Sequence, residues 1–264
     1  MNSLIHYILL MRFELIALAV IVFLLLAKIF SEKLNPSLLL GFVNLALVGM
    51  LGVYCFGAEG SLFGGMFVMD KMIALEKAII VFATLLIMLQ ANSWLKTQEN
   101  YMEFCLLLFS VLMGMFFLVS SGNFLMFFLG LEMATIPLAA LAAFDFGRKR
   151  SAEGAAKMIL SSAFSSAILL FGFSILYGTT GSLDFSEIRD SFIGSPLQLF
   201  ALAFIFAGFA FKISLVPFHL WTADVYEGSP VAVTTFLSVV SKAASVFIFI
   251  TVLAKVFPLS LIHI

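Results

Sequence analysis

Long apolar stretches alternate with short polar segments along the chain. Each stretch approaches the ~20 predominantly apolar residues that a helix needs to cross a bilayer. Stretches of that length with few charges are typical of membrane-spanning helices. The pattern predicts an all-α, polytopic membrane protein with about eight transmembrane helices, near residues 11–30, 37–57, 73–91, 103–120, 122–143, 154–178, 197–217 and 230–257.

Local signals agree with several of these boundaries. A polar residue precedes a proline at Asn35-Pro36, Ser195-Pro196 and Ser229-Pro230. This arrangement favours a helix start, because the side-chain oxygen accepts a backbone N–H and proline needs no N–H in the first turn. The connection at 120–123 is very short. We therefore expect the fourth and fifth spans to form an antiparallel hairpin.

Composition supports the membrane assignment. Hydrophobic residues make up 63% of the chain and charged residues 11%, whereas soluble domains carry about 45–50% and about 25%. This excludes a soluble enzyme, a disordered tail and a disulfide scaffold. The 14 Lys and Arg against 15 Asp and Glu leave no basic surface for nucleic acid. With two cysteines and no glycine-rich nucleotide fingerprint, we expect no metal and no cofactor in this chain.

The distribution of basic residues predicts the orientation, because cytoplasmic loops are enriched in lysine and arginine. The run 148–150 dominates and is expected to be cytoplasmic, with the N-terminus outside the inner (plasma) membrane. The segment 218–229 falls on the cytoplasmic side without a positive residue, so we expect a loop that folds into the protein. The loops after odd-numbered spans contain Lys28, Lys33, Lys96, Arg148, Lys149 and Arg150, and the opposite side contains Arg12, Lys71 and Arg189.

Three ionisable residues fall well inside predicted spans: Glu132 in the fifth, Lys212 in the seventh and Lys242 in the eighth. Charges at membrane depth are costly, so by default they mark a functional site. The alternative is a purely structural buried ion pair. Lys157 lies near the cytoplasmic start of the sixth span, where it could instead extend to the interface or pair with Glu153 one turn earlier.

Two further charges, Glu76 and Lys77, lie close to the outer end of the third span. Long charged side chains at such a depth extend their head groups to the interface. We expect that behaviour of both residues and assign them no function.

Proline positions add a second observation. Pro137 follows Glu132 by five residues, and Pro217 follows Lys212 by the same interval. A proline inside a helix frees the carbonyl four residues earlier, and freed backbone at membrane depth must meet protein or water. We expect a water-admitting kink beside each charge, although prolines also occur in spanning helices without such a role. His219 is a weaker candidate for proton exchange, the alternative being an ordinary hydrogen-bonded histidine.

The stretch 211–230 closely resembles a signature of the antiporter-like subunits of proton-pumping NADH:quinone oxidoreductase, respiratory complex I. It contains Val-Pro-Phe-His-Leu-Trp followed by Asp-Val-Tyr-Glu-Gly. The sequence of this stretch is most similar to that of the N-type subunits. Residues 131–138, Leu-Glu-Met-Ala-Thr-Ile-Pro-Leu, and the run 234–242 favour that type over the L- and M-type relatives. The motifs are strong over roughly 100–257 and weaker in the first three spans.

The resemblance implies a fold of two inverted five-helix repeats, a common transporter arrangement. Residues 103–258 would form the first repeat, after three helices in 1–102, and the second repeat is absent. The final six residues, 259–264, match a translated transposase adapter end, CTG TCT CTT ATA CAC ATC. We expect these six residues to be non-native and the natural protein to continue after Pro258, the alternative being a natural short protein with a coincidental tail.

The resemblance also implies roles for the charged residues. Glu132 and Lys212 would form a pair, Lys242 would continue a polar axis, and Lys157 would match a sixth-span lysine. The seventh helix would be discontinuous. Displacement of the Glu132 carboxylate would switch Lys212 between holding and releasing a proton, with Lys242 as acceptor through ordered water and Glu153 and Lys157 nearer the cytoplasm.

By resemblance, the chain is a membrane-arm subunit that takes part in proton translocation. Its partners would be the M-, L-, K- and J-type membrane subunits and the bilayer, with NADH, FMN, iron–sulfur clusters and quinone bound in partner subunits. Three alternatives stay open: the D-type subunit of a multisubunit cation/proton antiporter, a membrane subunit of a membrane-bound hydrogenase, and a structural membrane protein that transports nothing.

Overall fold

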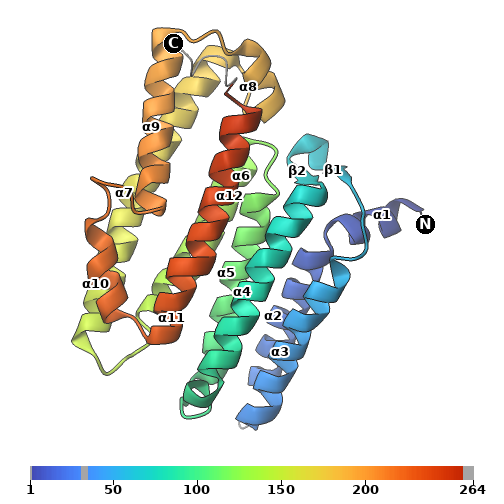
Figure 1. Ribbon diagram of the computed structural model, residues 1–264, viewed down its shortest axis with the longest axis vertical. Coiled ribbons are helices and arrows are strands. Elements are labelled where there is room, and N and C mark those ends of the chain that lie inside the picture. The colour runs from blue at the N-terminus through green and yellow to red at the C-terminus, as the bar shows by residue number, and fades with distance from the viewer. Residues whose placement is uncertain (1, 31–34, 258–264) are drawn as a thin grey trace.

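A computed structural model describes residues 2–30 and 35–257, and most of these residues are helical (Figure 1). The predicted non-native tail, 259–264, lies outside the described residues. The helices are α1 Asn2–Leu10, α2 Arg12–Phe30, α3 Pro36–Val53, α4 Lys71–Leu95, α5 Tyr101–Val119, α6 Phe124–Ala142, α7 Lys149–Thr180, α8 Phe185–Ser191, α9 Pro196–Lys212, α10 Leu220–Gly228, α11 Val231–Phe236 and α12 Lys242–Lys255, with a π-helical segment at Leu237–Ser241. A small antiparallel hairpin joins β1 Gly60–Leu62 to β2 Phe67–Met69 through the 3-10 turn Phe63–Gly65.

Seven helical segments among the described residues are long and apolar enough to cross a membrane: α2 to α7, and the continuous run Val231–Lys255 that joins α11 to α12. The fold class predicted from the sequence is confirmed. The seventh predicted span, 197–217, is wrong as a continuous helix, because α9 ends at Lys212 after 17 residues. The predicted loop 218–229 is also corrected, since most of it forms α10. Figure 1 shows α9 and α10 following one another beside α7, so together they make one discontinuous crossing.

Two of the three predicted helix caps are present. Asn35 Oδ1 accepts the N–H of Ser37 at 3.0 Å. Ser195 and Gln198 form a reciprocal capping box, in which each side chain accepts from the other residue's backbone N–H. The prediction for Ser229 is wrong, because α11 begins at Val231 without a side-chain cap.

The predicted hairpin of the fourth and fifth spans is formed by α5 and α6, which pack closely along their length. Glycines allow this approach. A Cβ on Gly114 would lie 2.3 Å from the backbone nitrogen of Ala134, and one on Gly130 would lie 2.5 Å from that of Leu118. Any larger residue would force the two helices apart, so this hairpin is a rigid support for α6 and its charged residue.

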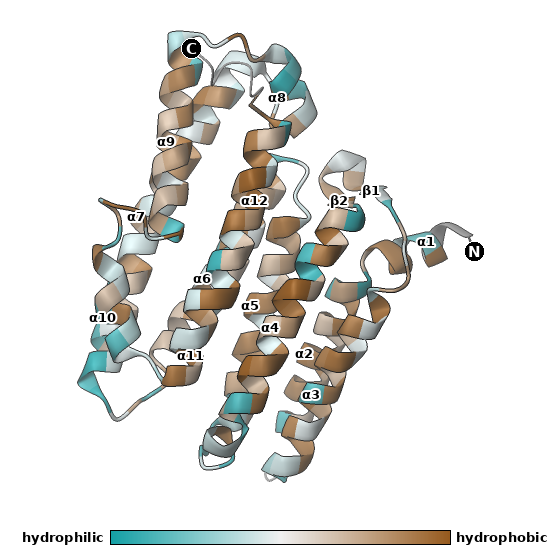
Figure 2. Ribbon diagram, viewed as in Figure 1, coloured by the Kyte–Doolittle hydropathy of each residue, from teal (hydrophilic) through white to brown (hydrophobic). Residues whose placement is uncertain are grey.

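The connections alternate between the two ends of the bundle, as the sequence predicts. Segments 96–100 and 143–148 lie at the lower end in Figure 1, and 120–123 and 181–184 lie at the upper end. Figure 2 shows hydrophobic residues over most of the helical surface and hydrophilic residues gathered around α10 at the lower end. Apolar side chains on the outside suit a lipid environment. The compartment that each end faces stays a prediction.

Candidate functional site

The break between α9 and α10 places Lys212 at the end of a helix inside the bundle. The chain leaves α9 through Ser214, whose φ of 61° lies in the left-handed region. Thr222 Oγ1 donates to Ser214 Oγ at 2.7 Å, and Trp221 Nε1 donates to the Phe211 carbonyl at 3.3 Å. The Phe211 and Trp221 rings are also stacked, with centroids 5.2 Å apart. These contacts fix the break and thereby the base of the Lys212 side chain.

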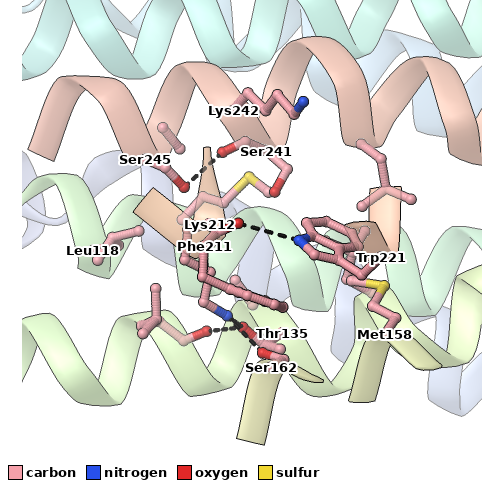
Figure 3. Close-up of a pocket in the computed structure, with 16 residues that line it drawn as sticks. Leu118, Thr135, Met158, Ser162, Phe211, Lys212, Trp221, Ser241, Lys242 and Ser245 are labelled. Atoms are coloured by element: carbon pink, nitrogen blue, oxygen red, sulfur yellow. Dashed lines mark hydrogen bonds between the residues drawn. The ribbon is translucent and has the colours of Figure 1, made fainter. Parts of the chain in front are cut away.

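The ammonium of Lys212 is held by two hydroxyl groups. It donates to Thr135 Oγ1 on α6 at 2.9 Å and to Ser162 Oγ on α7 at 2.8 Å, as Figure 3 shows. Thr135 and Ser162 are both buried. Neither hydroxyl carries a charge, so Lys212 is solvated by neutral groups in an otherwise apolar region.

Glu132 lies on the same face of α6 as Thr135, one turn earlier. Its carboxylate accepts a hydrogen bond from Ser166 Oγ at 2.5 Å. Within the described residues, no ion pair of 4.0 Å or less joins Glu132 to Lys212. Ser162 and Ser166 are one turn apart on α7, so each charged residue contacts one of these two serines rather than the other charge.

A cavity of about 30 Å³ lies beside Lys212 and is lined by Lys242 as well. By volume it has room for about two water molecules, which need polar partners. Its polar lining comes from α6, α7 and the last span: Thr135, Ser162, Ser241 and Ser245. The structure therefore brings the two predicted lysines to one hydratable space, although the Lys242 ammonium points away from Lys212 (Figure 3).

A π-helical segment, Leu237–Ser241, comes directly before Lys242. Such single π turns within α-helices occur frequently at functional sites. Ser241, its last residue, lines the cavity. Sequence reasoning missed this segment, since the hydrophobic pattern continues through it without a proline or glycine.

Lys157 lies in a separate charged cleft of about 190 Å³ between α7 and α10. It contacts Glu153 at 2.7 Å, which confirms one of the predicted alternatives, and Asp224 at 2.7 Å. Arg150 and Glu227 form a further ion pair across the cleft. The sequence did not reveal Asp224 as a partner, because its segment was interpreted as a loop.

Two predicted features do not join this site as expected. His219 is exposed at the start of α10 and is not among the residues lining the cavity. Pro217 lies in the break between helices, so the predicted kink within a helix is wrong there. Pro137 does lie inside α6, and the helix continues through it.

A second buried charge pair lies outside the predicted site. Lys77 of α4 forms an ion pair with Glu14 of α2, and their side chains are 0% and 2% exposed. Phenyl rings, including those of Phe67 and Phe116, lie within 6 Å of the ammonium. The prediction that Lys77 extends to the interface is therefore wrong: α4 begins at Lys71, and Lys77 faces inward nearly two turns later.

Comparisons with known proteins identify relatives of this chain. A family model described as "NADH:quinone oxidoreductase/Mrp antiporter, TM" matches residues 121–262. NADH-quinone oxidoreductase subunit N of Phocaeicola vulgatus is 52% identical over 202 residues, covering 75% of this chain and 43% of the relative. The protein of the same name from Azobacteroides pseudotrichonymphae is 46% identical over 225 residues, covering 82% and 47%.

Solved structures show the same fold. A chain of respiratory complex I from Thermus thermophilus with bound Aureothin matches with a TM-score of 0.77 and 29% identity, covering 90% of this chain and 52% of that one. A chain of the Mrp complex from Dietzia sp. DQ12-45-1b matches with a TM-score of 0.75 at 20% identity, covering 93% and 49%. This chain spans about half the length of the curated relatives that it matches. The resemblance carried by residues 211–230 is thus confirmed, and the chain belongs to the NADH:quinone oxidoreductase/Mrp antiporter family.

Proposed function

We propose that this chain takes part in proton translocation as a membrane-arm subunit of an NADH:quinone oxidoreductase. The observation that carries the proposal is the placement of Lys212 at a helix break beside a hydratable cavity, where neutral hydroxyls hold its ammonium. One of these hydroxyls belongs to Thr135, which lies one helical turn after Glu132 on α6. The names of the curated relatives, all subunit N, support this activity over the antiporter and hydrogenase alternatives.

Proton exchange at Lys212 follows from its surroundings. An ammonium in a low-dielectric region is stabilised by a nearby carboxylate, and the stabilisation depends on their separation. Because Glu132 and Lys212 bind two serines one turn apart on α7, a small displacement of the carboxylate changes the interaction without breaking a direct ion pair. Approach of Glu132 favours the protonated lysine, and retreat favours release of the proton into the cavity.

The charged cleft would be the entrance of this proton route. Lys157 lies toward the end of α7 that carries the basic run, five residues before Ser162, and it contacts Glu153 of α7 and Asp224 of α10. That separation corresponds to a rise of about 7.5 Å. Protons would pass from the cleft to Lys212 and, through water in the shared cavity, to Lys242. His219 is exposed beside the break and is kept only as a weak candidate.

Partners and cofactors complete the proposal. The chain would assemble with M-, L-, K- and J-type membrane subunits in the inner (plasma) membrane, with the N-terminus outside. NADH, FMN, iron–sulfur clusters and quinone would be bound by other subunits, where electron transfer occurs.

The test is NADH-driven proton uptake by proteoliposomes that contain the purified, assembled complex. We expect Lys212→Ala and Glu132→Ala to abolish coupled uptake and Glu132→Asp to retain part of it. Lys212→Arg should also fail, because a guanidinium keeps its proton. Lys71→Ala, at a side chain that is 90% exposed, is the control. Normal pumping by the arginine variant would assign Lys212 a fixed structural charge, and a requirement for sodium would favour cation/proton antiport.

A further inference from the structure

Lys242 differs from the other two candidate lysines in its partners. Lys212 donates to two hydroxyls, and Lys157 contacts two carboxylates. Within residues 2–30 and 35–257, no hydrogen bond or ion pair is formed by the Lys242 ammonium. The group that faces it is the ring of Tyr226 on α10, whose centroid lies 5.4 Å from Lys242 Nζ.

The backbone of Tyr226 lies close to α11, where the Thr234 hydroxyl also reaches the carbonyls of Ser229 and Pro230. Thr234 Oγ1 of α11 donates to the Tyr226 carbonyl at 3.2 Å, and the preceding Val225 is fully buried. Its phenolic oxygen is buried and has no hydrogen-bond partner in the described part of the chain. Among the described residues, the polar contact of this side chain is therefore made by the ring, with Lys242, and not by the hydroxyl.

We propose that Tyr226 is a positioning residue for Lys242, a role that rests on the proposed function. The face of an aromatic ring attracts an ammonium, and more strongly where water is excluded. Figure 3 shows the Lys242 head group turned away from Lys212, although both residues line one cavity. The ring holds the ammonium on that side and so sets the gap that water must bridge between the two lysines.

The position of Tyr226 on α10 connects this contact to the rest of the site. Residues two apart on a helix point to nearly opposite sides. Asp224 contacts Lys157 of α7 on one side, and Tyr226 faces Lys242 on the other. Trp221, one turn before Asp224, bonds to the carbonyl next to Lys212. One short helix thus contacts the surroundings of all three lysines.

The experiment replaces the ring and the hydroxyl separately in the assembled complex. Tyr226→Phe keeps the ring, whereas Tyr226→Leu and Tyr226→Met remove it at similar volume. We expect the phenylalanine variant to keep most of the NADH-driven proton uptake per assembled complex. The leucine and methionine variants should lose about tenfold, between the scales of an exposed and a fully desolvated ring–cation contact. Tyr177→Leu, at an exposed tyrosine of α7, should pump normally, and Lys242→Ala tests the proposed function itself.

The outcomes separate the two ideas. If Lys242→Ala loses pumping while the leucine and methionine variants pump fully, the role of Tyr226 is overturned and the proposed function stands. Loss of pumping in the phenylalanine variant would assign the effect to the hydroxyl and also overturn it. If both ring-less variants fail to assemble while the phenylalanine variant assembles, the ring serves folding instead. Normal pumping by Lys242→Ala overturns the role of Tyr226 and also the place of Lys242 in the proposed proton route.

Discussion

Glu132 and Lys212 are linked through α7 rather than through each other: Lys212 donates to Ser162, and Glu132 accepts from Ser166 one turn later. The two serines therefore determine how far apart the opposite charges lie. Because the serines are one turn apart, the charges carried by α6 and α9 meet the same side of α7. We therefore expect the hydroxyls of Ser162 and Ser166 to affect proton exchange, as the two charged residues do.

Removal of either serine hydroxyl should weaken proton translocation. A hydrogen bond to a charged group contributes about 1.5–3 kcal/mol. We expect Ser162→Ala and Ser166→Ala each to lower NADH-driven proton uptake by roughly tenfold or more. Ser161→Ala, on the neighbouring position that lines an open apolar groove, is the matched control. Equal uptake by all three variants would show that the serines only fill space.

The buried pair of Glu14 and Lys77 should behave as a structural contact. Breaking a buried pair leaves an uncompensated charge and costs about 3–5 kcal/mol, whereas replacing both partners with apolar residues is often neutral. We expect Glu14→Gln and Lys77→Met each to lower the thermal unfolding temperature in detergent. The double variant Glu14→Leu/Lys77→Met should recover it and pump normally. Loss of pumping by a stable double variant would instead place this pair on a proton route.

The exposed pair of Lys71 and Glu59 provides the control for that measurement. Its atoms are 3.6 Å apart, and the side chains are 90% and 54% exposed. Exposed pairs contribute about 0–1 kcal/mol. Lys71→Ala should therefore leave the unfolding temperature within the error of the measurement.

Pro137 offers a test of backbone polarity near Glu132. Its ring leaves the carbonyl of Met133 without the usual helical donor, next to the carboxylate-bearing residue. Pro137→Ala restores that donor, so we expect reduced pumping with normal assembly of the complex. Full pumping would mean that the five-residue spacing from Glu132 is incidental.

The orientation can be checked by cysteine labelling from outside the cell. Positions 149 and 186 are exposed and lie at opposite ends of the bundle. Lys149→Cys should resist a membrane-impermeant reagent, and Ser186→Cys should react. The background must lack both natural cysteines, since Cys55 is exposed. Labelling at 149 and protection at 186 would reverse the predicted orientation.

Sequence patterns predicted the helices because length and apolarity alone specify a membrane span. They failed at the break after Lys212, where Ile-Ser-Leu-Val is as apolar as the helix before it. A serine in the left-handed region leaves no mark in the hydrophobic pattern. The α10 segment carries Asp224 and Glu227, which made it look like a loop, although both residues face the partner charges of α7.

The candidate lysines were found because charge at membrane depth is rare. The sequence did not reveal the partners of these lysines, because a contact such as that between Lys157 and Asp224 joins residues 67 positions apart in the chain. Glu14 and Lys77 show the same limit at 63 residues. Glu14 was not singled out from the sequence, and Lys77 was interpreted by its nearness to a span end. Only the fold shows that it faces inward.

The length of α7 makes bilayer thickness a variable for this site. Its 32 residues extend about 48 Å, while the hydrocarbon core is about 30 Å thick. The helix must therefore tilt or extend beyond the hydrocarbon core. Its charged first turns are the part whose exposure to water costs the least free energy. Thicker lipids would draw Glu153 and Lys157 toward hydrocarbon, and thinner lipids would leave their cleft in water. Lipid chain length should therefore regulate how readily protons reach Lys212, independently of any change in the protein.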